Sequence, residues 1–185
     1  DCLSKANLTP QDIDALTFVS CTGAFESPAM CWEIAFALDM REDVIHTPIS
    51  GAGCAGAVPG LRRAWEYLRL NPGRRALVVC TEISHAAYHP QVDFGTAIGN
   101  GIFADGSSCY LVQGVGKGLR MIDFVELNNY RERHTVAMTL KDAQFKLILP
   151  HRTSELSTPM VLRIAEKLLR NGALGLADIN YWVFH

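Results

Sequence analysis

The fold is organised around one stretch of the sequence, Ser50-Gly51-Ala52-Gly53-Cys54-Ala55-Gly56-Ala57. This stretch joins an apolar run at residues 44–49 to a helical pattern at residues 56–70. Because glycine tolerates backbone angles that other residues avoid, this glycine-rich stretch predicts a sharp turn from a strand into a helix. A cysteine at the N-terminus of a helix lies where unpaired N–H groups and the helix dipole favour the thiolate. Cys54 is therefore a candidate nucleophile, and the alternative is a buried packing thiol.

Around this turn, apolar runs of strand length alternate with helical patterns. The predicted strands are residues 15–21, 44–49, 76–80, 109–113, 119–125, 145–149 and 181–184. The predicted helices are residues 28–38, residues 56–70 and a segment that begins between Thr153 and Pro159 and ends at Asn171. Residues 76–80 are apolar throughout, which is typical of a central parallel strand covered on both faces. This alternation predicts the α/β fold class.

The predicted helices differ in how they should pack. In residues 56–70, apolar side chains three and four residues apart predict an inner stripe made of Val58, Leu61, Trp65 and Leu68. Residues 28–38 are apolar on nearly every side, which is typical of a helix covered all round, in part by a second subunit. Residues 131–142 are polar and predict no element.

Composition narrows the class of protein. Hydrophobic residues make up 49% of the 185 residues and the formal net charge is −2, so we expect a packed core and neither a nucleic-acid partner nor an anionic membrane partner. The apolar runs are too short to span a membrane and no signal-peptide pattern opens the sequence. We therefore expect a cytoplasmic protein.

The cysteine and histidine spacings do not favour a metal site. Six cysteines are spread without a C-x-x-C pair, unlike most zinc sites and small disulfide frameworks. His85 and His89 are four residues apart, but the mixed sequence around them favours a solvated loop pair. We expect no bound metal and no permanently bound cofactor.

A glycine-rich connection at residues 114–118 predicts a division into residues 1–115 and residues 116–185. The last predicted strand ends at His185 with no covering element after it. In an α/β pattern this indicates part of a longer protein.

Several motifs occur in an order that resembles a known family. After the Gly-Cys turn come Leu77-Val78-Val79-Cys80-Thr81-Glu82-Ile83-Ser84, then Phe103-Ala104-Asp105-Gly106, then a strand ending at His185. Together they resemble the type III polyketide synthases, the chalcone and stilbene synthase family of the thiolase-like superfamily. Ala104 stands where that family has a glycine. The resemblance implies an incomplete thiolase-like layered fold, with the later part of the N-terminal half in residues 1–115 and the opening part of the C-terminal half in residues 116–185.

The resemblance also implies roles for the matching residues. Cys54 matches the nucleophile that takes the acyl group from coenzyme A, and His185 matches the histidine that keeps the thiolate charged and holds the malonyl thioester carbonyl. Phe103 and Phe145 match two gatekeeping phenylalanines between the CoA tunnel and the cavity. Positions that line the cavity in the plant enzymes are matched by Thr22, Ser84, Ala87 and Gly99. The catalytic asparagine has no match in residues 1–185, so we expect this chain alone to be inactive.

The implied activity is that of an acyltransferase. It condenses an acyl-CoA starter with malonyl-CoA by decarboxylative Claisen condensation and makes a polyketide, with coenzyme A thioesters as substrates and a homodimer as the assembly. Two alternatives remain at this point. One is a condensing enzyme similar to beta-ketoacyl-ACP synthase III, and the other is a non-catalytic α/β module in which Cys54 only packs.

Overall fold

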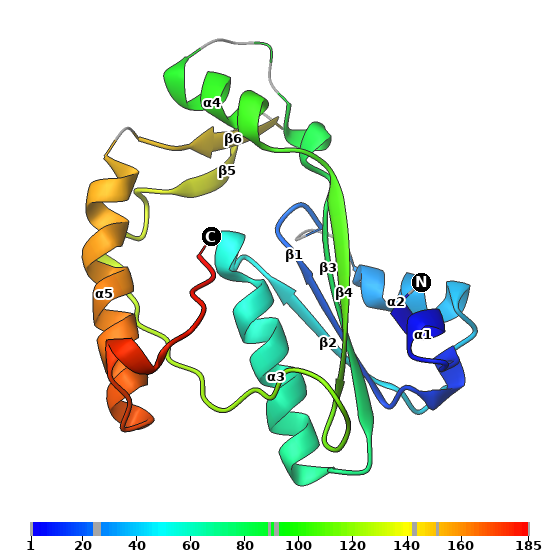
Figure 1. Cartoon of the computed structure of the whole chain (residues 1–185). Helices are drawn as coiled ribbons and strands as arrows, with labels where there is room; N and C mark the ends of the chain where they lie inside the picture. The colour runs from blue at the N-terminus through cyan, green and yellow to red at the C-terminus, as the bar shows by residue number, and fades with distance from the viewer. Residues whose placement is uncertain are drawn as a thin grey trace. The chain divides into compact units, whose positions relative to one another are not determined.

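A computed structural model describes residues 2–23, 27–88, 90, 93–141, 144–150 and 152–184, with the backbone alone at residues 87, 139–141 and 144–147 (Figure 1). The chain forms two compact units. The first comprises residues 1–90 and 99–119, and the second comprises residues 91–98 and 120–185. The helix α4 (Phe94–Ile102) belongs partly to each of them. None of the helices among the described residues is long and apolar enough to cross a membrane.

The first unit is built on a four-stranded sheet of order β2-β1-β3-β4. β1 (Ala15–Ser20), β2 (Ile45–Ser50) and β3 (Arg75–Glu82) are parallel, and β4 (Gly106–Gln113) is antiparallel to β3. All six residues of β1 are buried, because this strand has a neighbour on each side and helices over both faces. Four predicted strands and the α/β class are thereby confirmed.

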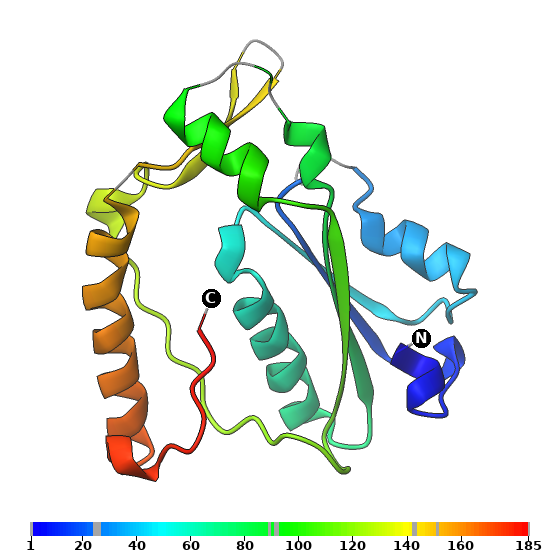
Figure 2. The ribbon, with the colours of Figure 1, turned by 45° about the horizontal axis from the view of Figure 1, so that its top comes forward.

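Helices cover both faces of this sheet (Figure 2). α3 (Ala57–Leu70) packs on one face against β1 and β3. α1 (Cys2–Lys5) and α2 (Met30–Ala37) lie on the other face. The core beneath α2 is a cluster of buried residues: Ile13, Leu16, Phe18, Cys31, Val44 and Leu77.

The predicted inner stripe of α3 is partly wrong. Its buried residues are Gly60, Ala64 and Leu68, whereas Val58 is 53% exposed. The reason is that α3 lies very close to β1, since a Cβ at Gly60 would be 2.8 Å from Val19 Cγ2. Small residues four apart therefore face the sheet, and the bulkier apolar side chains are rotated away from it.

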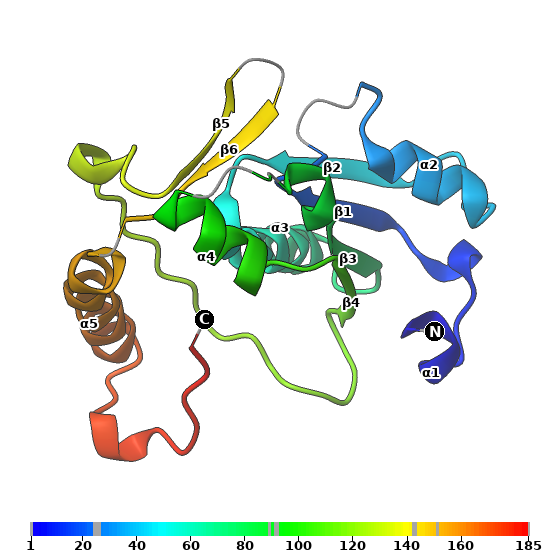
Figure 3. The same cartoon turned by 90° about the horizontal axis from the view of Figure 1, so that it is seen from above.

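The second unit contains a hairpin and a long helix (Figure 3). β5 (Ala137–Lys141) pairs with β6 (Gln144–Ile148) in antiparallel register, and α5 (Thr153–Asn171) follows. β6 and α5 confirm predictions, whereas β5 lies in the segment for which the sequence predicted no element. Short 3-10 helices complete the chain: Pro10–Asp12 (η1), Gly53–Ala55 (η2), Ser84–Ala87 (η3), Tyr130–Glu132 (η4) and Leu176–Asp178 (η5).

Two predicted strands are wrong. Residues 119–125 and 181–184 are irregular, and Leu119 and Val183 are almost fully exposed (Figure 2). An apolar run forms a strand only where a neighbour completes its hydrogen bonds, and within the described residues neither segment has one. In the second segment, Trp182 instead stacks on Phe184 with ring centroids 5.8 Å apart.

Candidate functional site

Cys54 lies on the turn that joins β2 to α3. It occupies the middle of η2, three residues before α3 begins. Gly51 and Gly53 have φ angles of +71° and +60°, which side chains rarely adopt, so the glycines make this turn as predicted. The Cys54 side chain is exposed rather than packed in the core. An exposed thiol just before a 14-residue helix is accessible to an electrophilic substrate.

The end of β1 lies beside this turn. Ser20 and Ser50 are register partners, so β1 and β2 end at the same edge of the sheet. Cys21 follows β1 directly, and the backbone of Gly53 is close enough to influence its thiol. Burial, followed by the negative charge of Glu82, raises the pKa of the Cys21 thiol. Cys21 is therefore a neutral thiol next to the Cys54 turn.

Glu82, at the end of β3, fixes the chain that follows β1. Its carboxylate accepts hydrogen bonds from the backbone N–H of Cys21 (2.8 Å), the backbone N–H of Thr22 (3.0 Å) and the Thr22 hydroxyl (2.8 Å). Thr22 Oγ1 in turn accepts from the backbone N–H of Ile83 at 2.9 Å. These bonds bring Thr22 next to the segment that leads into Ser84. The role of Glu82 was not predicted from the sequence, where the available signal was an acidic residue at the end of an apolar strand.

A second polar cluster lies where β3 ends and β4 begins. The backbone N–H of His85 donates to Asp105 Oδ1 at 2.9 Å, and His85 Nδ1 is 2.5 Å from Asp105 Oδ2. Asp105 immediately precedes β4, and Gly106 is the register partner of Glu82. The sequence predicted a solvated loop position for His85 but not its pairing with Asp105, because the two residues are separated by twenty positions.

The remaining predicted site residues are less fully described. Gly99 is a buried position of α4, and Phe103, one residue beyond this helix, is 41% exposed. Phe145 lies in β6 and Ala87 in η3, but both side chains are outside the described part of the chain. His185 also lies outside the described residues, so its pairing with Cys54 stays a prediction.

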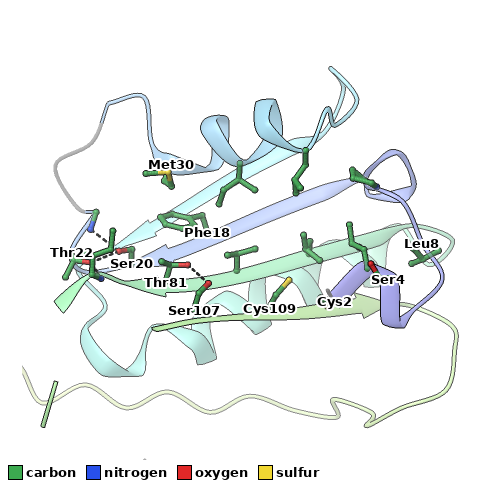
Figure 4. A pocket seen from close by; sticks show the side chains of 18 of the residues that line it. Cys2, Ser4, Leu8, Phe18, Ser20, Thr22, Met30, Thr81, Ser107 and Cys109 are labelled. Carbon is green, nitrogen blue, oxygen red and sulfur yellow. Dashed lines mark hydrogen bonds between the residues drawn. The ribbon is translucent and has the colours of Figure 1, made fainter. Parts of the chain in front are cut away.

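A cavity of about 780 Å³ lies on the opposite sheet face from α3, beneath α1 and α2 (Figure 4). Most of its lining is apolar, and hydroxyl groups gather toward one end: Ser20, Thr22, Thr81 and Ser107. Thr81 and Ser107 share a hydrogen bond of 2.8 Å. Cys2 and Cys109 also line this cavity, and burial together with the neighbouring Cys2 thiol raises the pKa of Cys109 to about 12.

A comparison with protein-family models identifies the family to which this chain belongs. The model described as FAE1/Type III polyketide synthase-like protein matches residues 1–168. The chain belongs to this family. The resemblance in the order of motifs is thereby confirmed.

Curated relatives of this chain include two bacterial synthases. A 1,3,6,8-tetrahydroxynaphthalene synthase of Streptomyces griseus is 28% identical over 173 residues, which is 89% of this chain and 45% of the relative. A 3,5-dihydroxyphenylacetyl-CoA synthase of Amycolatopsis balhimycina is 25% identical over 189 residues, which is 100% of this chain and 50% of the relative. The chain thus spans about half the length of the curated relatives it matches.

Solved type III polyketide synthases share the fold. The tetrahydroxynaphthalene synthase of Streptomyces coelicolor superposes with a TM-score of 0.92 at 24% identity, over 100% of this chain and 53% of that chain. PKS-I of the brown alga Ectocarpus siliculosus superposes with a TM-score of 0.88 at 27% identity. The match covers 97% of this chain and 49% of that chain. The predicted thiolase-like α/β fold, incomplete relative to these structures, is confirmed.

Proposed function

We propose that this chain is the nucleophile-bearing part of a type III polyketide synthase that condenses an acyl-CoA starter with malonyl-CoA. The observation that carries the proposal is the exposed Cys54 on a glycine turn before α3, in a chain that belongs to the family. No permanently bound cofactor is needed for this chemistry, because the coenzyme A thioesters are themselves the substrates.

Cys54 is proposed to carry the growing chain. Its thiolate attacks the carbonyl carbon of the starter thioester, the carbon–sulfur bond to coenzyme A breaks, and the acyl group stays on Cys54. Malonyl-CoA then loses carbon dioxide and leaves an enolate, whose carbon attacks the acyl carbon and displaces Cys54. Because negative charge develops on the enolate oxygen, a hydrogen-bond donor must face it, and His185 is proposed to supply that donor.

The other matched residues are proposed to shape the cavity. Phe103 and Phe145 would shield the enolate from water, which would otherwise protonate it. The proposed lining consists of Thr22, Ser84, Ala87 and Gly99. The hydrogen bonds that tie Thr22 to Glu82 and to Ile83 support a rigid wall at this position.

The test uses the full-length protein with malonyl-CoA and a panel of acyl-CoA starters, without carrier protein. We expect release of carbon dioxide and a polyketide product detected by mass spectrometry. Cys54→Ser should lower product formation by at least about 10³-fold, because the serine hydroxyl is not ionised at neutral pH. Cys80→Ser is the matched control and should retain activity, since burial raises the pKa of the Cys80 thiol.

Two results would contradict the proposal. Product formation only with an acyl carrier protein would support the condensing enzymes that use that carrier. The absence of any acylation of Cys54 would support a non-catalytic module.

A further inference from the structure

His85 and Asp105 form a histidine–carboxylate pair that the proposed condensation does not use. Asp105 holds His85 at two points, through the backbone N–H and through ring Nδ1, at 2.9 Å and 2.5 Å. This clamp fixes both the position of the residue and the orientation of the imidazole. Such orientation by a carboxylate is what a histidine needs to transfer protons.

The pair leaves one ring nitrogen available. Hydrogen bonds from the His85 backbone N–H and from its ring hold the pKa of Asp105 below its usual range, so the carboxylate is ionised near neutral pH. An ionised carboxylate only accepts hydrogen bonds, so Nδ1 carries a hydrogen, and whenever the ring is neutral Nε2 is the nitrogen with the free lone pair. The His85 side chain is 74% exposed, so the ring is accessible from outside the pair.

The pair also lies at the functional edge of the sheet. η3 begins at Ser84, two residues after the last residue of β3, and Ile83 between them is tied to Thr22 through its backbone N–H. Ile83 and Ala86, three residues and thus one 3-10 turn apart, line the cavity beneath α1 and α2, and His85 is the neighbour of Ala86 in this helix. His85 therefore lies at the border of this cavity.

We propose that His85 is a second proton-transfer group, positioned by Asp105, which acts on the poly-β-keto intermediate during ring closure. This inference rests on the proposed function. The ligand class it names is a chain carrying methylene groups between two carbonyls, whose C–H protons are acidic enough for an imidazole base.

The step balances without an oxidant or a co-reactant. Nε2 accepts a proton from such a methylene, and the resulting carbanion forms a carbon–carbon bond with a carbonyl carbon of the same chain. The electron pair of that carbonyl moves to its oxygen, which takes the proton back from Nε2. Asp105 stabilises the imidazolium that exists between these two transfers.

The test uses the full-length protein with His85→Asn and His85→Gln. Asparagine keeps a donor close to the position of Nδ1, and so can keep the Asp105 bond, but it lacks Nε2. Glutamine reaches the Nε2 position without a basic nitrogen. For both variants we expect the ratio of ring-closed to open-chain products, normalised to acylated Cys54, to fall at least about tenfold.

His134→Asn is the matched control, because His134 is an exposed histidine of the second unit. It should leave the product ratio unchanged. A wild-type product ratio in His85→Asn would overturn the inference, and so would an equal loss of Cys54 acylation and ring closure, which indicates a structural role. If the wild-type protein makes no polyketide from any starter, the proposed function itself has failed.

Discussion

Cys54 differs from the other thiols of the chain in its surroundings. Burial raises the pKa of Cys21, Cys31 and Cys80, and it contributes most to the pKa of about 12 at Cys109. Each unit by which a thiol pKa rises lowers the thiolate fraction about tenfold at neutral pH. Cys54 is exposed and precedes a helix N-terminus.

We therefore predict that iodoacetamide at neutral pH labels Cys54 in the full-length protein before those four thiols. The rate should exceed theirs by at least about tenfold, since the thiolate is the reactive form. Peptide mass spectrometry at timed intervals measures the order. Comparable rates at all six cysteines would contradict a nucleophilic Cys54.

Asp14 is a nearly buried carboxylate that accepts three hydrogen bonds. Its side chain, 8% exposed, accepts from Arg41 (3.0 Å), Arg74 (2.6 Å) and the backbone N–H of Arg75 (2.8 Å). Burial would raise the pKa of Asp14, but these hydrogen bonds outweigh it and lower the pKa. Asp14 therefore ties the start of β1 to the start of β3.

We predict that Asp14→Asn lowers the free energy of unfolding at pH 7 by about 2 kcal/mol, because it removes the charge from a buried bonded carboxylate. The folded pKa lies below the unfolded value of about 3.9, so this contribution is present above that pH and is lost as pH falls through the folded pKa. Urea unfolding at pH 7 and pH 3 measures both effects. Asp43→Asn changes an exposed partner of Arg41 and should lower the free energy of unfolding much less. Equal losses of stability in the two variants would contradict the role of burial.

At the scale of elements, the contact between α3 and the sheet depends on glycine. A Cβ at Gly60 would lie 2.8 Å from Val19 Cγ2 and 3.2 Å from Val78 Cγ1, so part of the contact must shift. Alanine at this position would stabilise the helix by about 1 kcal/mol through its propensity, but overpacking would destabilise the fold by about 1–3 kcal/mol.

We predict that Gly60→Ala lowers the free energy of unfolding by about 1 kcal/mol and also reduces condensation, because α3 carries the Cys54 turn at its start. Gly73→Ala is the control, since a Cβ there meets nothing within 4 Å. Urea unfolding and product formation are measured on both variants. Unchanged activity in Gly60→Ala would show that the position of α3 tolerates the shift.

The packing of α2 against β2 should be sensitive to pH. His46 of β2 stacks on Trp32 of α2 with ring centroids 4.8 Å apart, and its buried Nδ1 has no hydrogen-bond partner among the described residues. Burial lowers the pKa of His46, since it disfavours the charged ring. The unfolded chain therefore takes up the proton first.

It follows that His46 contributes stability that is present above its unfolded pKa of about 6.5 and is lost as pH falls through the folded pKa. We predict that His46→Phe, which keeps a stacking ring, loses less stability than the wild type between pH 7.5 and pH 5. Urea unfolding at the two pH values measures the difference. Identical losses would contradict a buried neutral His46.

Some of the elements predicted from the sequence have a pattern that is satisfied locally. The Cys54 turn follows from its glycines, and α5 follows from its period of apolar residues. Residues 119–125 and 181–184 have the apolar character of strands, but strand formation depends on a neighbour that the run itself does not specify. The same reason made two hydrogen bonds unpredictable. Glu82 bonds Thr22 sixty positions away, and Asp105 bonds His85, because the order of the strands in the sheet brings these residues together.

At the scale of the whole molecule, the first unit exposes an apolar surface around α2. Phe36 is 86% exposed, and Trp32 and Ile45 are also exposed beside it on α2 and β2. β2 is an edge strand of the described sheet, so its outer backbone groups have no strand partner there. Exposed apolar groups of this kind mark an interaction surface.

We predict that the full-length protein is a dimer in solution and that Phe36→Glu shifts it toward the monomer. In a two-fold interface the same patch is used twice, so burying Phe36 contributes about 1.5–3 kcal/mol per copy and its loss should raise the dissociation constant by more than about 100-fold. Light scattering after size exclusion, over a range of concentrations, measures this shift. Leu70→Glu, which changes an exposed apolar residue at the end of α3, is the matched control. If Leu70→Glu dissociates the dimer and Phe36→Glu does not, the interface lies over α3 and the surface around α2 faces another partner.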